Sequence, residues 1–179
     1  MFCPTCGTER TFEFRDQRMY FAFLRMPLWP VSEMTTVPRC LGCRNEFYRS
    51  DLEKAAVQHH AELGERTRDV MGGFLKFYEF TDESSIRNLA ERFNSTDSDS
   101  WTRELNKFVA RENQADWLIF VSRRSDLLTL ERRHEIVNAA VGLRHEGENQ
   151  ADVEHRIRQF ANAIGLGQGD IESMLERIR

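Results

Sequence analysis

Two stretches of this chain, Cys3-Pro4-Thr5-Cys6 and Cys40-Leu41-Gly42-Cys43, contain all four of its cysteines. A Cys-x-x-Cys turn places two thiolates on one cation, and two such turns supply the four ligands of a closed tetrahedral zinc site. We therefore predict one zinc ion per chain, held by Cys3, Cys6, Cys40 and Cys43. Because protein atoms then fill every coordination position, no water can be activated there, and we expect a structural zinc.

The residue that follows each pair bears on the shape of its turn. Gly7 can take the positive φ that such a turn needs. Arg44 stands at the equivalent position of the second pair, with Asn45 after it. Since asparagine tolerates the left-handed region better than most residues, the sequence allows the second turn to be shifted by one residue.

Three other interpretations of the cysteines stay open. Disulfides need an oxidising compartment, and Met1-Phe2-Cys3 leaves no room for a signal peptide. A thioredoxin-like redox pair is expected where a strand meets a helix. Residues 7–12 lack the pattern of a helix start, which argues against this interpretation. Reduced thiols without metal would leave the segment with little core. Zinc is the interpretation that we favour.

The segment between the two pairs is rich in aromatic and β-branched residues, which predicts short antiparallel strands with proline confined to edges and turns. The residues concerned are 12–15, 19–24, Val31 and Val37, with breaks at Pro27, Pro30 and Pro38. The longest apolar run is too short to span a bilayer, because Arg25 and Glu33 interrupt it.

This segment resembles a small bacterial zinc-ribbon family. In that family Cys-Pro-x-Cys-Gly is followed by an aromatic-rich strand ending in Pro-x-x-Pro, and then by a second Cys-x-x-Cys. The matching residues are Cys3 to Gly7, Tyr20 to Val31, Cys40 to Cys43, and Phe47. The resemblance covers residues 1–48 and implies a ribbon fold, although Arg44 stands where the family usually has glycine.

The charge of the ribbon bears on nucleic-acid binding. Residues 1–50 carry seven arginines against five acidic residues, a net charge of +2. A zinc ion with four thiolates contributes −2, so the module is nearly neutral, whereas phosphate contacts need net positive charge. The aromatic residues are more simply the ribbon's own core. Binding of nucleic acid by the ribbon is thus the alternative, and not the favoured, function.

From Ser50 onward the pattern becomes helical, the net charge is −6, and no proline occurs. Expected helix ends include Gly64, Gly72-Gly73, Gly147 and Gly165, and expected starts include 81–83, Thr129 and Asn149. Each helix carries an apolar stripe that is expected to be buried; Val141 is among these residues, and Ile178 is expected in the last helix. The predicted fold class is α+β, with a small antiparallel ribbon followed by an all-α bundle. The predicted limits are 1–48 for the ribbon, 49–70 for a linker helix and 71–179 for the helical domain.

In the helical part, a scheme of a helix, a turn bearing an acid and a capped helix runs over 120–131, is echoed over 138–147 and continues over 160–166. Residues 70–179 thereby resemble the TerB-like (tellurite-resistance B) helical domain, whose helices end in an Ala-Asp-Gly turn followed by Ser/Thr-x-x-Glu and later by Leu-Gly-Leu. The resemblance associates the acids of these turns with divalent cations, which makes candidates of Asp126, Glu131, Glu146, Asp152 and Glu154. Ser125-Asp126 and Glu146-Gly147 depart from the usual Asp-Gly. Because a calcium ion needs some 6–8 oxygen ligands, we favour ordinary turn and helix-start roles for these acids.

The other polar groups suggest no catalytic set. His59 and His60 are not at the i, i+4 spacing of facing metal ligands. Arg123, Arg124, Arg132 and Arg133 form a basic cluster that we interpret as solvated surface; it could also contact an acidic partner. We expect a cytoplasmic, non-enzymatic zinc-binding interaction or scaffold protein with a protein partner. The TerB resemblance implies a bacterial stress- or envelope-linked setting. A nucleic-acid-associated regulator is the alternative, and an unseen hydrolase or transferase site is the least favoured.

Overall fold

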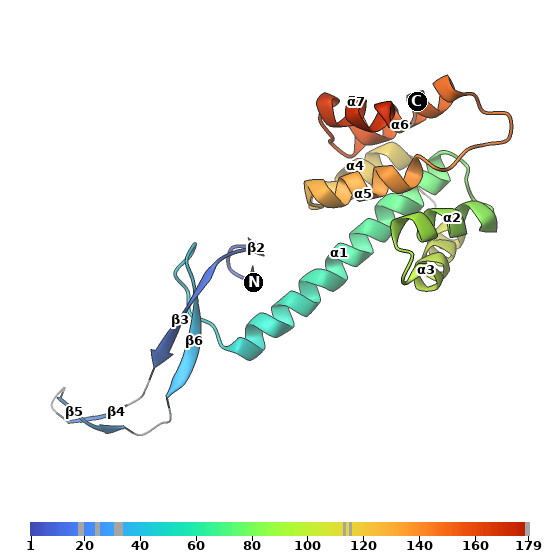
Figure 1. The fold of residues 1–179 in the computed structure, drawn as a ribbon. Helices are drawn as coiled ribbons and strands as arrows, with labels where there is room; N and C mark the ends of the chain where they lie inside the picture. Colours follow the sequence, from blue (N-terminus) through green and yellow to red (C-terminus); the bar gives the residue numbers. More distant parts are fainter. Residues whose placement is uncertain (18–19, 24–25, 31–33, 113, 115, 178–179) are drawn as a thin grey trace. The chain divides into compact units, whose positions relative to one another are not determined.

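The computed structural model describes residues 1–17, 20–23, 26–30, 34–112, 114 and 116–177. Its contacts divide the chain into two compact units, Met1–Glu62 and Leu63–Arg179, called here the ribbon unit and the helical unit (Figure 1). The fold is α+β, as predicted. The boundary between the units falls inside the segment expected to be a linker helix.

Among its described residues, the ribbon unit contains three two-stranded antiparallel sheets (Figure 1). They pair β1 with β2, β3 with β6 and β4 with β5, and the bounds are β1 Phe2–Cys3, β2 Thr8–Glu9, β3 Phe12–Gln17, β4 Tyr20–Phe23, β5 Met26–Pro30 and β6 Thr35–Cys40. The predicted antiparallel strands are therefore confirmed. The predictions for Met19, Leu24, Arg25, Val31 and Glu33 concern residues outside the described part of the chain.

The three prolines expected to break strands lie within them instead. Pro27 and Pro30 belong to β5, and Pro38 belongs to β6, where it pairs with Phe14. A two-stranded sheet has only edge strands, so each strand has one side on which a missing N–H costs no ladder hydrogen bond. This topology explains why proline is accepted here.

Seven helices are described, of which α1 belongs to both units. Their bounds are α1 Arg49–Phe77, α2 Glu83–Phe93, α3 Ser98–Arg111, α4 Trp117–Ser125, α5 Leu130–Ala140, α6 Gln150–Ala163 and α7 Gln168–Glu176. The predicted starts are confirmed, because the side chains of Asp82, Thr129 and Asn149 each accept a hydrogen bond from an N–H of the first turn. Ile178, expected in the last helix, lies outside the described residues.

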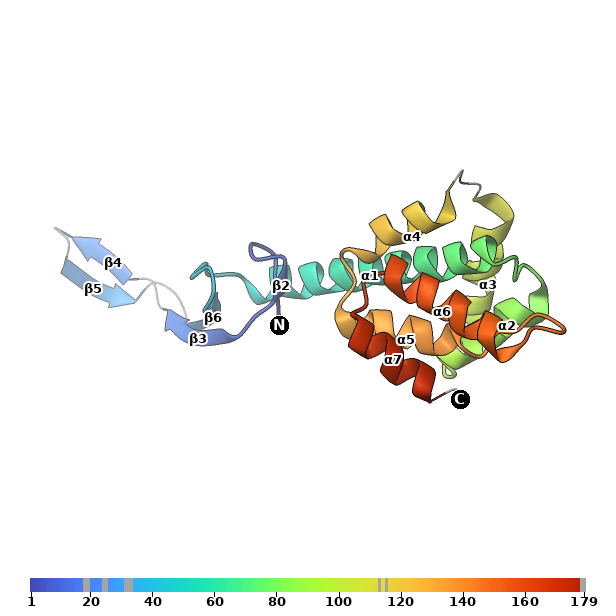
Figure 2. The same cartoon turned by 90° about the horizontal axis from the view of Figure 1, so that it is seen from above.

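The core of the helical unit forms around the C-terminal half of α1. Val70, Met71, Phe74 and Leu75 are almost wholly buried, and both Figure 1 and Figure 2 show this half of α1 among the other helices. The predicted apolar stripes of the later helices supply most of the remaining core, including Ile86, Leu105, Ile136, Ile157 and Phe160. Val141, expected to be buried, is only half-buried.

The predicted breaks at Gly64 and at Gly72-Gly73 are wrong, since all three lie inside α1. A Cβ at Gly72 would lie 2.2 Å from the Phe108 ring, and one at Gly73 would lie 2.4 Å from Val121. These two glycines therefore serve close packing of α3 and α4 on α1. The expected stop at Gly147 is also wrong, because α5 ends at Ala140 and Gly147 takes its positive φ of 78° in the following loop.

Candidate metal centre

The four cysteines lie on two turns of the same shape. In the first, the Gly7 amide donates to the Cys3 carbonyl at 2.9 Å, and in the second the Arg44 amide donates to the Cys40 carbonyl at 2.9 Å. Gly7 has a φ of 67° and Arg44 a φ of 63°. The second turn is therefore not shifted to Asn45. Arg44 itself takes the left-handed conformation, which costs a non-glycine residue roughly 1–2 kcal/mol.

Strand pairing brings these turns together. The first turn joins β1 to β2, and the second follows β6, whose partner β3 begins after β2. The Leu41 amide donates to the Thr11 carbonyl at 3.0 Å, and the Asn45 side-chain amide reaches from one turn to the other, donating to Thr5 Oγ1 at 3.1 Å. Asn45 thus ties the two turns together.

The sulfur atoms form one compact group. All four Sγ atoms lie within 4.8 Å of one another, with 3.7 Å between Cys3 and Cys43 and 3.9 Å between Cys6 and Cys40. Four sulfurs placed 2.3 Å from a central zinc would be about 3.8 Å apart, by the geometry of a tetrahedron. The arrangement therefore fits a single tetrahedral metal ion.

The surroundings affect the four thiols differently. The backbone N–H groups of Cys43 and Gly42 point at the Cys40 sulfur and lower the pKa of Cys40 from 9.0 to about 7. Burial raises the pKa of the Cys3 thiol, against a backbone hydrogen bond from Cys6 that lowers it. Metal ligation requires thiolates, and amide donors that favour the charged form are typical of such a site.

The acids that the TerB resemblance singled out are not gathered into a site. Among the described residues, the four cysteines are the only group of three or more ligand side chains close enough to share an ion. The acids are spread over the C-cap of α4, the first turn of α5, the first two turns of α6 and the loop between these helices. Asp126, Glu131, Glu146 and Asp152 are exposed and Glu154 is half-buried.

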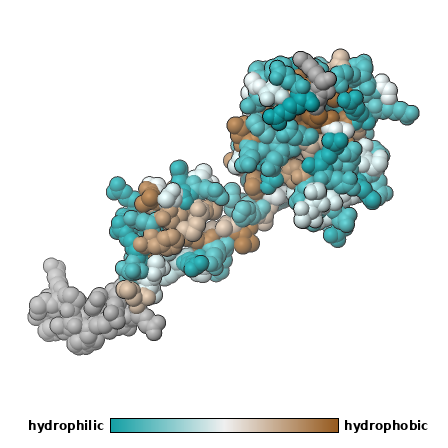
Figure 3. Space-filling model, viewed as in Figure 1, coloured by the Kyte–Doolittle hydropathy of each residue, from teal (hydrophilic) through white to brown (hydrophobic). Residues whose placement is uncertain are grey.

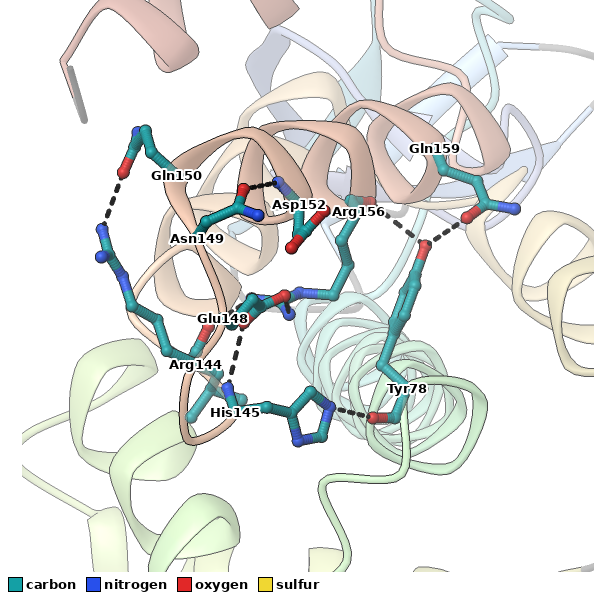
Figure 4. Close-up of polar contacts among 10 residues, drawn as sticks. Tyr78, Arg144, His145, Glu148, Asn149, Gln150, Asp152, Arg156 and Gln159 are labelled. Atoms are coloured by element: carbon teal, nitrogen blue, oxygen red, sulfur yellow. Dashed lines mark hydrogen bonds and ion pairs between the residues drawn. The ribbon is translucent and has the colours of Figure 1, made fainter.

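A different acid, Glu148, organises the loop between α5 and α6. Its carboxylate pairs with Arg156, and the two side chains are only 10% and 5% exposed. Arg156 also donates to the Leu143 carbonyl, and the His145 amide donates to Glu148 at 3.0 Å (Figure 4). Burial, the largest single influence, raises the pKa of Glu148, but the hydrogen bonds from Arg156 and from the His145 amide, together with the charge of Arg156, outweigh burial, so that its pKa is lowered.

The same network joins this loop to the end of α1. The Tyr78 hydroxyl lies 3.1 Å from the Arg156 carbonyl, and His145 Nε2 donates to the Tyr78 carbonyl at 2.8 Å (Figure 4). The His145 ring stacks on Phe80 with centroids 4.0 Å apart, and burial raises the pKa of Tyr78. Sequence reasoning missed this set, because Tyr78 and Phe80 are far from His145, Glu148 and Arg156 in the chain. The one local signal was the acid pair Glu146 and Glu148 in a Gly-containing loop.

The basic cluster is largely engaged within the helical unit. Arg124 pairs with the buried Asp69 of α1 at 3.2 Å, and Arg132 with Glu135 at 2.7 Å. Arg133 donates to the carbonyls of Asp126, Leu128 and Gly165. These arginines therefore fasten turns and helices of their own unit.

The two adjacent histidines of α1 lie in the ribbon unit. His59 is half-buried and stacks on Phe2 with centroids 4.1 Å apart and 12° between the ring planes, whereas His60 is exposed. His59 thus holds the strand that carries Cys3 against α1.

Comparisons with family models, with curated proteins and with solved structures find no match to this chain. Among the helices in the described part of the chain, none is both long enough and apolar enough to cross a membrane.

Proposed function

We propose that this chain is a non-enzymatic, zinc-binding interaction or scaffold protein. The single observation that carries the proposal is the closed group of four sulfur atoms at tetrahedral spacing. Zinc is the ion favoured by four thiolates in this geometry. A zinc with four protein ligands has no open position for water, so its role is to hold the surrounding turns in place.

The exposed apolar side chains of the ribbon unit support an interaction role. Six large hydrophobic residues in the described part of this unit are more than half exposed: Met1, Phe14, Met34, Leu41, Tyr48 and Val57. Figure 3 shows apolar surface gathered on this unit, bordered by hydrophilic residues. Apolar surface of this kind, rimmed by polar groups, is typical of protein-binding faces.

The proposal includes a cellular setting. A bacterial stress- or envelope-linked assembly, with the protein in the cytoplasm, follows from the TerB resemblance of residues 70–179. The fold class is compatible with that resemblance, and the setting rests on it alone.

Affinity purification from the source cells, followed by mass spectrometry, tests the proposal. The wild-type chain is compared with Cys40→Ser, which removes one ligand and leaves the core of the helical unit untouched. We expect partners that bind wild type and are lost with Cys40→Ser. An unchanged partner list would separate the metal centre from binding.

A further inference from the structure

The ribbon unit contains a groove between its strands and the first half of α1. Its volume is about 330 Å³, and its apolar lining, which defines the ribbon groove, consists of Met1, Phe2, Phe14, Pro38, Leu52 and Ala56. All of these residues belong to the ribbon unit. The metal centre adjoins the groove, because Phe2 directly precedes Cys3 and Pro38 lies two residues before Cys40.

The floor of the groove is already packed, while one wall is open. Leu52 is only 4% exposed, Pro38 is buried, and Phe2 is fixed by its stacking on His59. Phe14, in contrast, is 63% exposed although it lines the groove. A guest side chain could therefore enter without displacing the floor, and would cover apolar surface that Phe14 now presents to water.

The charges beside the groove select the guest. Glu9 and Glu53 line it, together with Arg49, His59 and His60. Arg49 pairs with Glu53 at 3.3 Å, but this pair is highly exposed and so weak, and no ion pair among the described residues engages Glu9. Carboxylates at this place repel phosphates and attract ammonium or guanidinium groups.

We infer that the ribbon groove binds a segment of a partner protein that inserts an apolar side chain and places a lysine or arginine near Glu9 and Glu53. This inference rests on the proposed function and names the chemistry of the partner. A nucleic acid fits poorly, because its phosphates would face the two carboxylates.

A random dodecamer peptide library, displayed on phage and selected against the zinc-loaded full chain, tests this inference. We expect enriched sequences to combine an apolar residue with a nearby lysine or arginine. A synthetic copy of the most enriched peptide should bind Ala56→Trp, which fills the groove, at least about tenfold more weakly. It should bind the double charge reversal Glu9→Lys/Glu53→Lys more weakly by a similar factor.

Two matched variants serve as controls. Gln58 lies two residues after Ala56 but is exposed and does not line the groove, so Gln58→Trp should bind the peptide as wild type does. Glu62→Lys reverses a charge of α1 away from the groove and should also have no effect. Zinc content equal to that of wild type shows that each variant has kept the fold of the ribbon.

Several outcomes would overturn the inference. These are no enrichment at all, peptides that bind Ala56→Trp as tightly as wild type, binding of oligo(dT) that is lost in Ala56→Trp, and a wild-type dimer that Ala56→Trp dissociates. The last two would give the groove to a nucleic acid or to a second copy. Partners lost with Cys40→Ser but retained by Ala56→Trp would leave the proposed function standing without the groove. A peptide that binds in the groove of a chain without zinc would leave the groove inference standing without the proposed function.

Discussion

At the scale of single residues, the backbone of Arg44 shows which conformation the two cysteine turns require. Both turns need a left-handed residue after the second cysteine, and the first meets this need with glycine whereas the second uses an arginine. The closed loop of hydrogen bonds around Cys40 must therefore sustain a conformation that arginine adopts at a cost.

Truncating Arg44 in two ways measures this cost. We expect Arg44→Gly to be more stable than Arg44→Ala by about 1 kcal/mol, since only glycine takes positive φ freely. At an ordinary position alanine is the better residue, and Arg10, which has no positive φ, supplies the matched pair Arg10→Gly and Arg10→Ala. The stability of each variant is measured by thermal denaturation of the zinc-loaded chain. The relevant transition is the one that disappears when a chelator is added. Equal stability of the two Arg44 variants would contradict the strain argument.

The pair of Glu148 and Arg156 supplies a second prediction at this scale. Arg156→Met leaves a mostly buried carboxylate without its partner, and we expect a loss of about 3–5 kcal/mol in the free energy of unfolding. Glu148→Gln combined with Arg156→Met should recover part of this loss. A loss below 1 kcal/mol in chemical denaturation of the single variant would show that the pair matters little.

The same pair predicts a dependence on pH. The folded chain lowers the pKa of Glu148, so its contribution to stability is present above the unfolded value of about 4.3 and is lost as the pH falls through the lower folded value. As the pH falls from neutral to below about 4, the free energy of unfolding of Glu148→Gln should therefore decrease less than that of wild type. Parallel stability curves for the two proteins would contradict this assignment.

At the scale of elements, the helix starts could be predicted and the extent of α1 could not. Thr129 and Asn149 are local signals, since each satisfies an N–H of its own first turn. Gly64, Gly72 and Gly73 look alike in sequence, and only tertiary packing decides that they do not break the helix. The Glu148 network was missed for the same reason: its partners meet only after the helices have packed.

The glycines of α1 give a matched test of this packing. At Gly72 and Gly73 an added Cβ would overlap Phe108 or Val121, whereas at Gly64 nothing lies within 4 Å. We expect Gly64→Ala to stabilise the protein by about 0.5–1 kcal/mol and Gly72→Ala or Gly73→Ala to destabilise it by about 1–3 kcal/mol. Thermal denaturation of the three variants decides, and the same sign at all three positions would refute the packing role.

At the scale of the whole molecule, the chain consists of two units with different sources of stability. The large apolar core belongs to the helical unit, whereas the ribbon unit has short two-stranded sheets that are marginal without further support. The Cys-x-x-Cys spacing was enough to predict that the four cysteines gather into one group, and the aromatic and β-branched residues between the two pairs predicted the short antiparallel strands. The ribbon groove could not be predicted from the sequence, because residues of the strands and of α1 that are far apart in the chain line it together.

Removing the metal should therefore affect the two units unequally. We expect a chelator to abolish hydrogen-exchange protection at the Leu41 and Phe47 amides, which bond across the ribbon, while residues 70–75 of α1 stay protected. Hydrogen exchange with mass spectrometry resolves the two regions. Simultaneous loss of protection in both would mean that the units unfold together.

The most direct test of the central claim is the metal content of the purified full chain, measured by native mass spectrometry alongside titration of its thiols. The account predicts one zinc ion per chain and four thiols that react with a thiol reagent only after a chelator has been added. A metal-free chain whose four cysteines react freely in the folded state would contradict it.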